Sequence, residues 1–139
     1  MRLPLIALAL VSSAVPARAD VDYFNLPSGN ITCYVGIEAD SVDISCTIFE
    51  RTPTLPRPAS CSGGWGHTVS MFGTGRVTIE CDDPRLSYTR PAAPPAQVLD
   101  YGRRMELRGI SCGSSKQGLE CRNADGHGFL LSRGKQRVF

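Results

Sequence analysis

Six cysteines are the feature of this sequence that most limits the folds open to it. They are Cys33, Cys46, Cys61, Cys81, Cys112 and Cys121, and all of them follow a segment with the features of a secretory signal. An even number of cysteines in an exported chain favours three disulfides, each stabilising the fold by roughly 2–4 kcal/mol. Zinc is the weaker interpretation, because no pair has the two-residue spacing that structural zinc sites prefer.

The first nineteen residues are typical of a signal peptide. Met1 and Arg2 precede an apolar run, and the segment ends in Ala17-Arg18-Ala19, a small-x-small pattern that signal peptidase accepts. We expect cleavage before Asp20 and a single disulfide-rich β domain over residues 20–139. The apolar run is too short to span a bilayer and no later segment is longer, so we expect no membrane span and a periplasmic or secreted protein.

Hairpin geometry selects among the possible cysteine partners. A turn about Ala39 and Asp40 would pair residues whose numbers sum to 79, which places Cys33 opposite Cys46. A turn centred between residues 116 and 117 similarly places Cys112 opposite Cys121. The third pair, Cys61 and Cys81, follows only by elimination. The predicted turn at 73–75 does not bring these two residues opposite each other.

Short β-rich runs separated by turn residues predict an all-β fold, since no window has a sustained helical pattern. We expect a small disulfide-stabilised antiparallel β-sandwich or partly closed barrel of about seven short strands. The expected strands are 30–36, 42–49, 68–72, 76–81, 104–112, 118–122 and 128–132.

The distribution of charge is more informative than its total. Without Arg2 and Arg18, the fifteen Lys and Arg become thirteen and equal the thirteen Asp and Glu. Residues 20–50 carry six acids and no base, whereas residues 103–139 carry eight bases and three acids. The two ends either lie beside each other or form a basic face for an acidic partner, such as an anionic envelope polymer. The neutral balance argues against a nucleic-acid partner.

The two histidines are the candidate residues for chemistry. His127 lies in Gly126-His127-Gly128, where the glycines are explained by a turn and a strand start, with Gly126 expected to have positive φ. The functional hypothesis joins His127 to His67 and a carboxylate from Asp125 or from Asp82 and Asp83, as a metal site or a hydrolase. Nothing in the spacing brings these side chains together. No serine occupies a Gly-x-Ser-x-Gly motif either, and the cysteines are expected to be oxidised.

Trp65 is the only tryptophan and lies in a glycine-rich loop. Such a residue usually seals a small core, but an exposed Trp65 would be a natural binding hot spot. Arginines near the C-terminus, including Arg133, would then be its polar companions.

Several motifs are similar to those of a known family. They are Phe24-x-x-Pro27-Ser28-Gly29-Asn30-Ile31-x-Cys33, Tyr101-Gly102, Gly118-Leu119-x-Cys121-x-Asn123 and Gly126-His127-Gly128-Phe129-x-Leu131-Ser132-Arg133, with Arg137 and Phe139 at the end. Together they resemble those of a family of small exported bacterial proteins that contain a domain of unknown function. The chain departs from the family pattern at Asp82-Asp83-Pro84 and at Gln136. The resemblance implies an exported location and a shared fold, and it implies no activity.

These observations favour a non-catalytic binding module over an enzyme. We expect a monomer without metal or cofactor that binds an envelope or secreted protein, as an inhibitor or adaptor, or an anionic polymer. The candidate binding residues are Trp65, His67, His127 and Arg133. The alternative is a metal-dependent or His/Asp hydrolase that uses His67 and His127.

Overall fold

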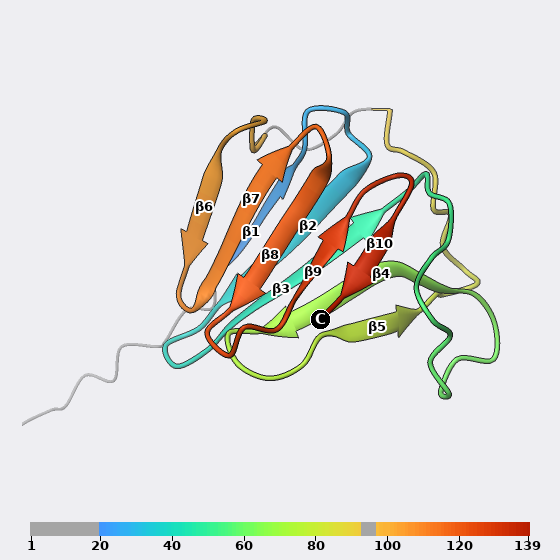
Figure 1. The fold of residues 1–139 in the computed structure, drawn as a ribbon, viewed down its shortest axis with the longest axis horizontal. Helices are drawn as coiled ribbons and strands as arrows, with labels where there is room; N and C mark the ends of the chain where they lie inside the picture. Colours follow the sequence, from blue (N-terminus) through green and yellow to red (C-terminus); the bar gives the residue numbers. More distant parts are fainter. Residues whose placement is uncertain (1–19, 93–96) are drawn as a thin grey trace, which may run out of the picture.

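A computed structural model describes residues 20–92 and 97–139 as two five-stranded antiparallel sheets. The first sheet contains β1 (Asp20–Asn25), β2 (Ile31–Ile37), β3 (Val42–Ile48), β4 (Trp65–Phe72) and β5 (Thr78–Cys81). The second contains β6 (Arg104–Leu107), β7 (Ile110–Ser115), β8 (Gly118–Asn123), β9 (Gly128–Leu131) and β10 (Gln136–Val138). Consecutive strands are neighbours in each sheet, and the second sheet lies over the first (Figure 1). The predicted all-β fold is confirmed as a sandwich whose sheets do not close into a barrel. The expected signal peptide lies outside the described residues.

Strict alternation of buried and partly exposed residues builds the core between the sheets. In β3, Val42, Ile44, Cys46 and Ile48 are buried, and the residues between them point outward. The same period in β7 and β8 supplies the facing layer, and both layers join one hydrophobic cluster. Each sheet therefore has one buried face and one outer face.

All three expected disulfides are present. Cys33 bonds Cys46 across β2 and β3, and Cys112 bonds Cys121 across β7 and β8. The predicted β2–β3 register, with partner numbers summing to 79, is confirmed along the whole hairpin. The pair found by elimination, Cys61–Cys81, ties the loop before β4 to the end of β5.

The expectation of about seven strands is wrong, because the described residues form ten. The single strand expected over 104–112 is a hairpin, since Gly109 takes a φ of 76° and turns the chain between Leu107 and Ile110. The short strands β1 and β10 were not expected. β4 begins at Trp65, three residues before the predicted start at Thr68.

The sequence segments of opposite charge form different layers. No residue of β1 to β5 is Lys or Arg, whereas β6, β8 and β10 contain Arg104, Arg122 and Arg137. The two outer faces therefore differ in the charge that they present. In the described part of the chain no helix is long and apolar enough to cross a membrane.

Candidate functional site

Loops from both sheets meet at one end of the sandwich and enclose a pocket of about 180 Å³. Turns after β1, β7 and β9 contribute to it, together with the long connections that carry Arg90 and Tyr101. Its lining residues are Leu26, Ser28, Asn30, Ile31, Arg90, Tyr101, Ser115, Lys116, Gly118, Ser132 and Arg133. Of the sequence-predicted binding residues, only Arg133 lies here. We call this the end-loop pocket.

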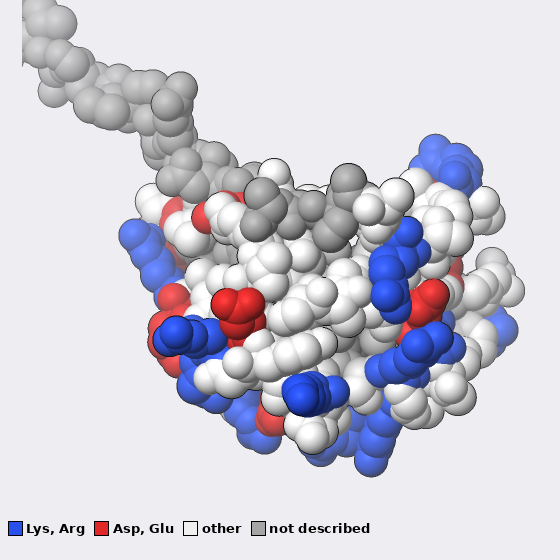
Figure 2. Space-filling model, turned by 90° about the horizontal axis from the view of Figure 1, so that it is seen from above, with Lys and Arg blue, Asp and Glu red and all other residues white. Residues whose placement is uncertain are grey.

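Basic side chains dominate the electrostatics of the end-loop pocket. Arg90, Lys116 and Arg133 line it, and none of its described lining residues is acidic. One nearby acid, Glu50, lies 2.6 Å from Arg90 Nη2 and 3.4 Å from Arg133 Nη2 through its Oε2 atom. Figure 2 shows this end of the molecule, where several basic side chains are spread over the surface and an acidic one lies between two of them. Three cations therefore face one carboxylate.

The position of Glu50 is fixed by a buried amide. Asn30 is 6% exposed; its Oδ1 accepts a hydrogen bond from the Glu50 backbone N–H at 2.8 Å, and its Nδ2 donates to the Glu50 carbonyl at 2.9 Å. This two-point contact joins the turn after β1 to the chain leaving β3. The backbone of Glu50 is thereby held beside the turn after β1, which places its carboxylate between Arg90 and Arg133.

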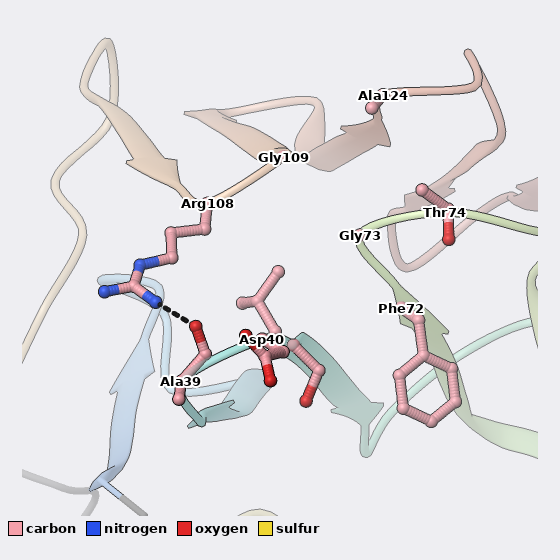
Figure 3. Close-up of a pocket in the computed structure, with 10 residues that line it drawn as sticks. Ala39, Asp40, Phe72, Gly73, Thr74, Arg108, Gly109 and Ala124 are labelled. Carbon is pink, nitrogen blue, oxygen red and sulfur yellow. Dashed lines mark hydrogen bonds between the residues drawn. The ribbon is translucent and has the colours of Figure 1, made fainter.

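A larger pocket, of about 510 Å³, lies at the other end of the sandwich. Figure 3 shows Arg108 on one side, Phe72 on the other and Asp40 between them. Arg108 Nη1 donates to the carbonyl of Ala39 at 2.9 Å, which fixes the β2–β3 turn. A Cβ at Gly73 would lie 3.0 Å from a methyl group of Val42, so glycine allows the turns to approach closely.

His127 belongs to the β8–β9 turn at that same end. The Asn123 N–H donates to the His127 carbonyl at 2.8 Å, and the His127 N–H donates to Asn123 Oδ1 at 3.1 Å. Gly126 has a φ of 81°, as predicted for this turn. The imidazole forms no hydrogen bond with any described residue. The backbone geometry of the turn thus accounts for the surrounding glycines without a catalytic role.

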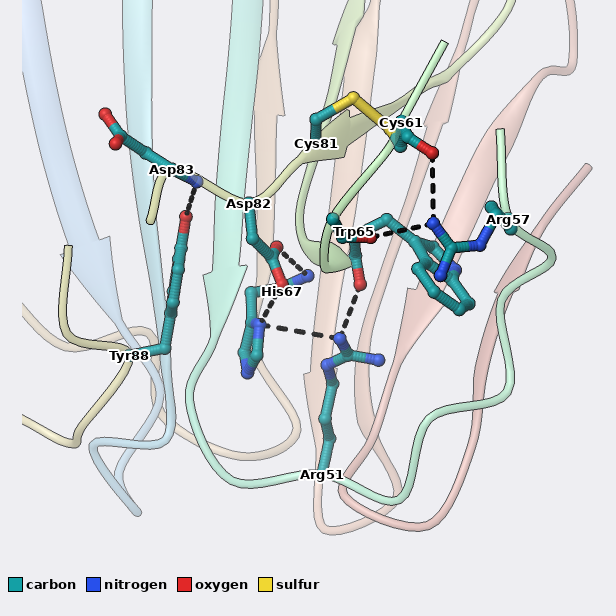
Figure 4. Close-up of a disulfide and its surroundings, with 10 residues drawn as sticks. Arg51, Arg57, Cys61, Trp65, His67, Cys81, Asp82, Asp83 and Tyr88 are labelled. Carbon is teal, nitrogen blue, oxygen red and sulfur yellow. Dashed lines mark hydrogen bonds and ion pairs between the residues drawn. A yellow bond between two sulfur atoms is a disulfide. The ribbon is translucent and has the colours of Figure 1, made fainter. Parts of the chain in front are cut away.

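Trp65 closes the loop that precedes β4. Its Nε1 donates a hydrogen bond to the Leu55 carbonyl at 2.9 Å, and the Arg57 guanidinium lies 4.1 Å from its ring centroid (Figure 4). The half-buried ring packs against the core cluster. These contacts explain Trp65 as a packing residue, and its expected binding role stays a prediction.

His67 pairs with Asp82 beside the third disulfide. The His67 Nδ1 lies 2.9 Å from Asp82 Oδ2, and the His67 backbone N–H donates to Asp82 Oδ1 at 3.2 Å. Tyr88 stacks on the imidazole with ring centroids 4.3 Å apart. Gly66 permits this arrangement, because its φ of 82° forms the irregularity where the β4–β5 register shifts.

Arg51 completes this cluster from the loop after β3 (Figure 4). Its Nη2 donates to the Trp65 carbonyl at 2.6 Å and lies 3.4 Å from His67 Nδ1. Its Nε and Nη1 are buried without a partner among the described residues. Burial lowers the pKa of Arg51, and the negative charge of Asp82 partly offsets this effect. A carboxylate only accepts and arginine only donates, so the two contacts require opposite states of Nδ1. The shorter contact, to Asp82, favours a proton on Nδ1 that points to the carboxylate.

The structure does not bring the two histidines together. Asn123, which holds the His127 turn, donates to the carbonyl of Phe72, the last residue of β4. His67 precedes Phe72 by five residues, which corresponds to about 17 Å along a strand. Asp82 is therefore a hydrogen-bond partner of His67 and not of His127. Among the described residues no three His, Cys, Asp or Glu side chains are grouped to hold a metal ion.

Sequence reasoning identified Arg133 but missed the other residues of its pocket. Arg90, Lys116 and Tyr101 belong to connections between strands, where no alternating pattern marks the direction of a side chain. Asn30 offered a signal, because a buried polar residue next to a strand is usually held by specific hydrogen bonds. The sequence could not indicate that its partner would be the backbone of Glu50.

The fold and the site together define a disulfide-stabilised β-sandwich with a basic pocket at one end. Residues 3–139 match a family of unknown function, DUF6636, and the chain belongs to that family. The expected resemblance to a domain of unknown function is thereby confirmed at the level of the family. No curated protein and no solved structure gives a significant match to this chain.

Proposed function

We propose that this protein is an exported, monomeric, non-catalytic binding module that recognises an anionic group on an envelope or secreted partner. Three disulfides in one small domain indicate an oxidising, extracellular environment. A signal peptide over residues 1–19 would deliver the chain there. The observation that carries the proposal is the convergence of Arg90, Lys116 and Arg133 on one pocket with no acidic lining residue.

The chemistry of the end-loop pocket suits a carboxylate or a phosphate. Glu50 already pairs with Arg90 and Arg133, but Lys116 forms no ion pair within the described chain, so the three cations exceed the one carboxylate by two. Arginine offers a planar set of donors that matches the geometry of an oxyanion. The Ser28 hydroxyl lines the same space and can donate a further hydrogen bond, whereas the Ser132 hydroxyl already donates to the Lys135 carbonyl.

Calorimetric titration with two polyanions tests this function. Polyglutamate presents the carboxylates of an acidic protein, and polyphosphate presents the phosphates of an anionic polymer. We expect binding to at least one, weakening as salt rises because the partly exposed charges are screened. Arg133→Ala and Lys116→Ala should each raise the Kd about tenfold, since a contact to a charged group contributes about 1.5 kcal/mol or more.

Lys135→Ala is the matched control. Lys135 lies in the same β9–β10 turn and is exposed, but it does not line the pocket. Removing it changes the net charge by the same amount as removing Arg133. Equal losses of affinity in the two variants would contradict a specific pocket, and so would no binding of either polyanion by the unmodified protein.

The alternative catalytic function has one supporting observation, the His67–Asp82 hydrogen bond of 2.9 Å. A carboxylate that orients an imidazole in this way occurs in hydrolases with a hydroxyl or thiol nucleophile. No hydroxyl or thiol of the described chain is hydrogen-bonded to His67. A hydrolase that relies on His67 should lose its activity on Asp82→Asn, and screening with generic ester and peptide substrates would reveal it.

A further inference from the structure

The outer face of the first sheet exposes aromatic side chains that the core does not use. Tyr23, Tyr34 and Phe72 are 42%, 53% and 63% exposed. Tyr23 lies opposite Tyr34 on the neighbouring strand, with ring centroids 6.1 Å apart. Phe72 is two strands away from Tyr34 and two residues further along, which puts their Cα atoms about 12 Å apart. Aromatic groups at separate points of one flat face are suited to an extended ligand.

Hydroxyl groups fill the space between these aromatic side chains. Register places Tyr34 beside Ser45, Ser45 beside Ser70, and Ser70 beside Thr78, so the row that starts at Tyr23 crosses all five strands. Successive partners in an antiparallel sheet point to the same side. The face is therefore polar along this row, where hydroxyl groups can donate and accept hydrogen bonds and Ser70 already donates to the Glu80 carboxylate.

The only charges that the strands themselves add near these rings are carboxylates. Asp43 lies opposite Phe72 in the register. Its Oδ1 occupies the space above Gly36, only 2.5 Å from where a Cβ would stand. Glycine at this position thus lets the carboxylate lie flat on the sheet beside an exposed ring. No residue of the five strands is Lys or Arg, so the strands supply no positive charge to attract an anionic ligand.

Sugar rings have the chemistry that complements such a face. The C–H side of a pyranose is apolar and packs on an aromatic ring, whereas its equatorial hydroxyl groups donate to carboxylates and exchange hydrogen bonds with serine. We propose that the outer face of the first sheet binds an uncharged polysaccharide chain, with sugar units on the Tyr23–Tyr34 pair and on Phe72. Asp43 accepts a hydrogen bond from a sugar hydroxyl between them.

The pocket at the β2–β3 turn lies next to this surface. Phe72 borders both the sheet face and the pocket, whose other side groups include Asp40 and Thr74 together with Arg108, which donates to the Ala39 carbonyl (Figure 3). A chain that crosses the sheet reaches these oxygen atoms next. The end-loop pocket lies at the opposite end of the sandwich, so the polysaccharide surface is independent of the anion-binding function.

Co-sedimentation with insoluble cellulose and chitin tests the proposal on the full chain. We expect the protein to sediment with at least one of them. Tyr34→Ala and Phe72→Ala should each weaken binding at least tenfold, because truncation of an aromatic anchor removes most of its contact area. Leu86→Ala is the control, since Leu86 is an apolar side chain of similar exposure, 61%, outside the sheets. Arg133→Ala should bind polysaccharide normally, which separates this proposal from the anion pocket.

Three results would overturn the inference. In the first, the unmodified protein sediments with neither polysaccharide, and in the second, the aromatic variants bind as well as Leu86→Ala does. In the third, sedimentation velocity would show a dimer that Phe72→Ala dissociates, which would make the face a contact between two copies of this chain. Both substitutions remove exposed side chains, and unchanged melting temperatures would confirm that the variants fold.

Discussion

Removing the Cys61–Cys81 disulfide separates the effect of a cross-link from the effect of core packing. The two cysteines are 20 residues apart, and the chain-entropy relation predicts a loss of about 3.3 kcal/mol at 25 °C. Cys81 is exposed at the end of β5, and Cys61, although buried, lies outside the hydrophobic core cluster, so replacing both residues with alanine removes little from that cluster. The double variant should therefore lose about this amount and remain folded.

The Cys33–Cys46 disulfide provides the comparison. Its separation of 13 residues predicts a smaller entropic loss, about 2.9 kcal/mol. Both of its cysteines are completely buried, so alanine at these positions also leaves a cavity between the sheets. We expect Cys33→Ala/Cys46→Ala to destabilise the domain more than Cys61→Ala/Cys81→Ala does, although its loop is shorter.

Urea unfolding followed by circular dichroism measures the free energies of unfolding. Trp65 fluorescence reports the loop separately, because its Nε1 bonds Leu55 within the segment that Cys61 anchors. A red shift in the Cys61→Ala/Cys81→Ala variant under native conditions would indicate local opening. The reasoning would be refuted by a loss below about 1 kcal/mol for this variant, or by the reverse order of the two variants.

Three further changes test other parts of the structure. Gly128→Ala should destabilise the domain by about 1–3 kcal/mol in thermal unfolding, because its Cβ would lie 2.0 Å from the Cys121 carbonyl oxygen. Asn30→Ala should cost about 2 kcal/mol in urea unfolding, since it removes two hydrogen bonds of about 1 kcal/mol each between the buried Asn30 amide and the Glu50 backbone. Hydrogen bonds from Arg85 lower the pKa of Asp83. The ionised Asp83 carboxylate keeps this contact above the lowered pKa, and the contact is lost as the pH falls through it. Arg85→Ala should raise this pKa toward its ordinary value in an NMR titration, and an unchanged value would contradict the assignment.

The hairpins could be predicted because their determinants are close together in the sequence. A polar turn between two β-rich runs sets the register, and the register places Cys33 opposite Cys46 and Cys112 opposite Cys121. The turn about Thr74 also has the predicted register, with Ser70 opposite Thr78. In each case one turn and two strands suffice, and no distant residue is needed.

The errors arose where a strand depends on a distant partner or on one glycine. β1 contains Asp22 as well as Phe24, and its pairing with the edge of β2 decides its structure. β10 has three residues and forms against β9. The 104–112 segment reads as one β-rich run, and only the backbone conformation of Gly109 reveals the turn.

The sequence by itself determined the all-β class and the two disulfides that cross hairpins, because these follow from β-rich runs and from residue spacing across short turns. Tertiary structure alone decided which side chains share a site. Arg90, Lys116 and Arg133 meet at one end because meanders return to that end at every second turn. His67 is near the start of β4, whereas His127 is in the turn after β8. The two histidines of the chain therefore lie at opposite ends of the sandwich. Proximity across a sandwich depends on how the two sheets stack, which is a property of the whole core and not of any segment.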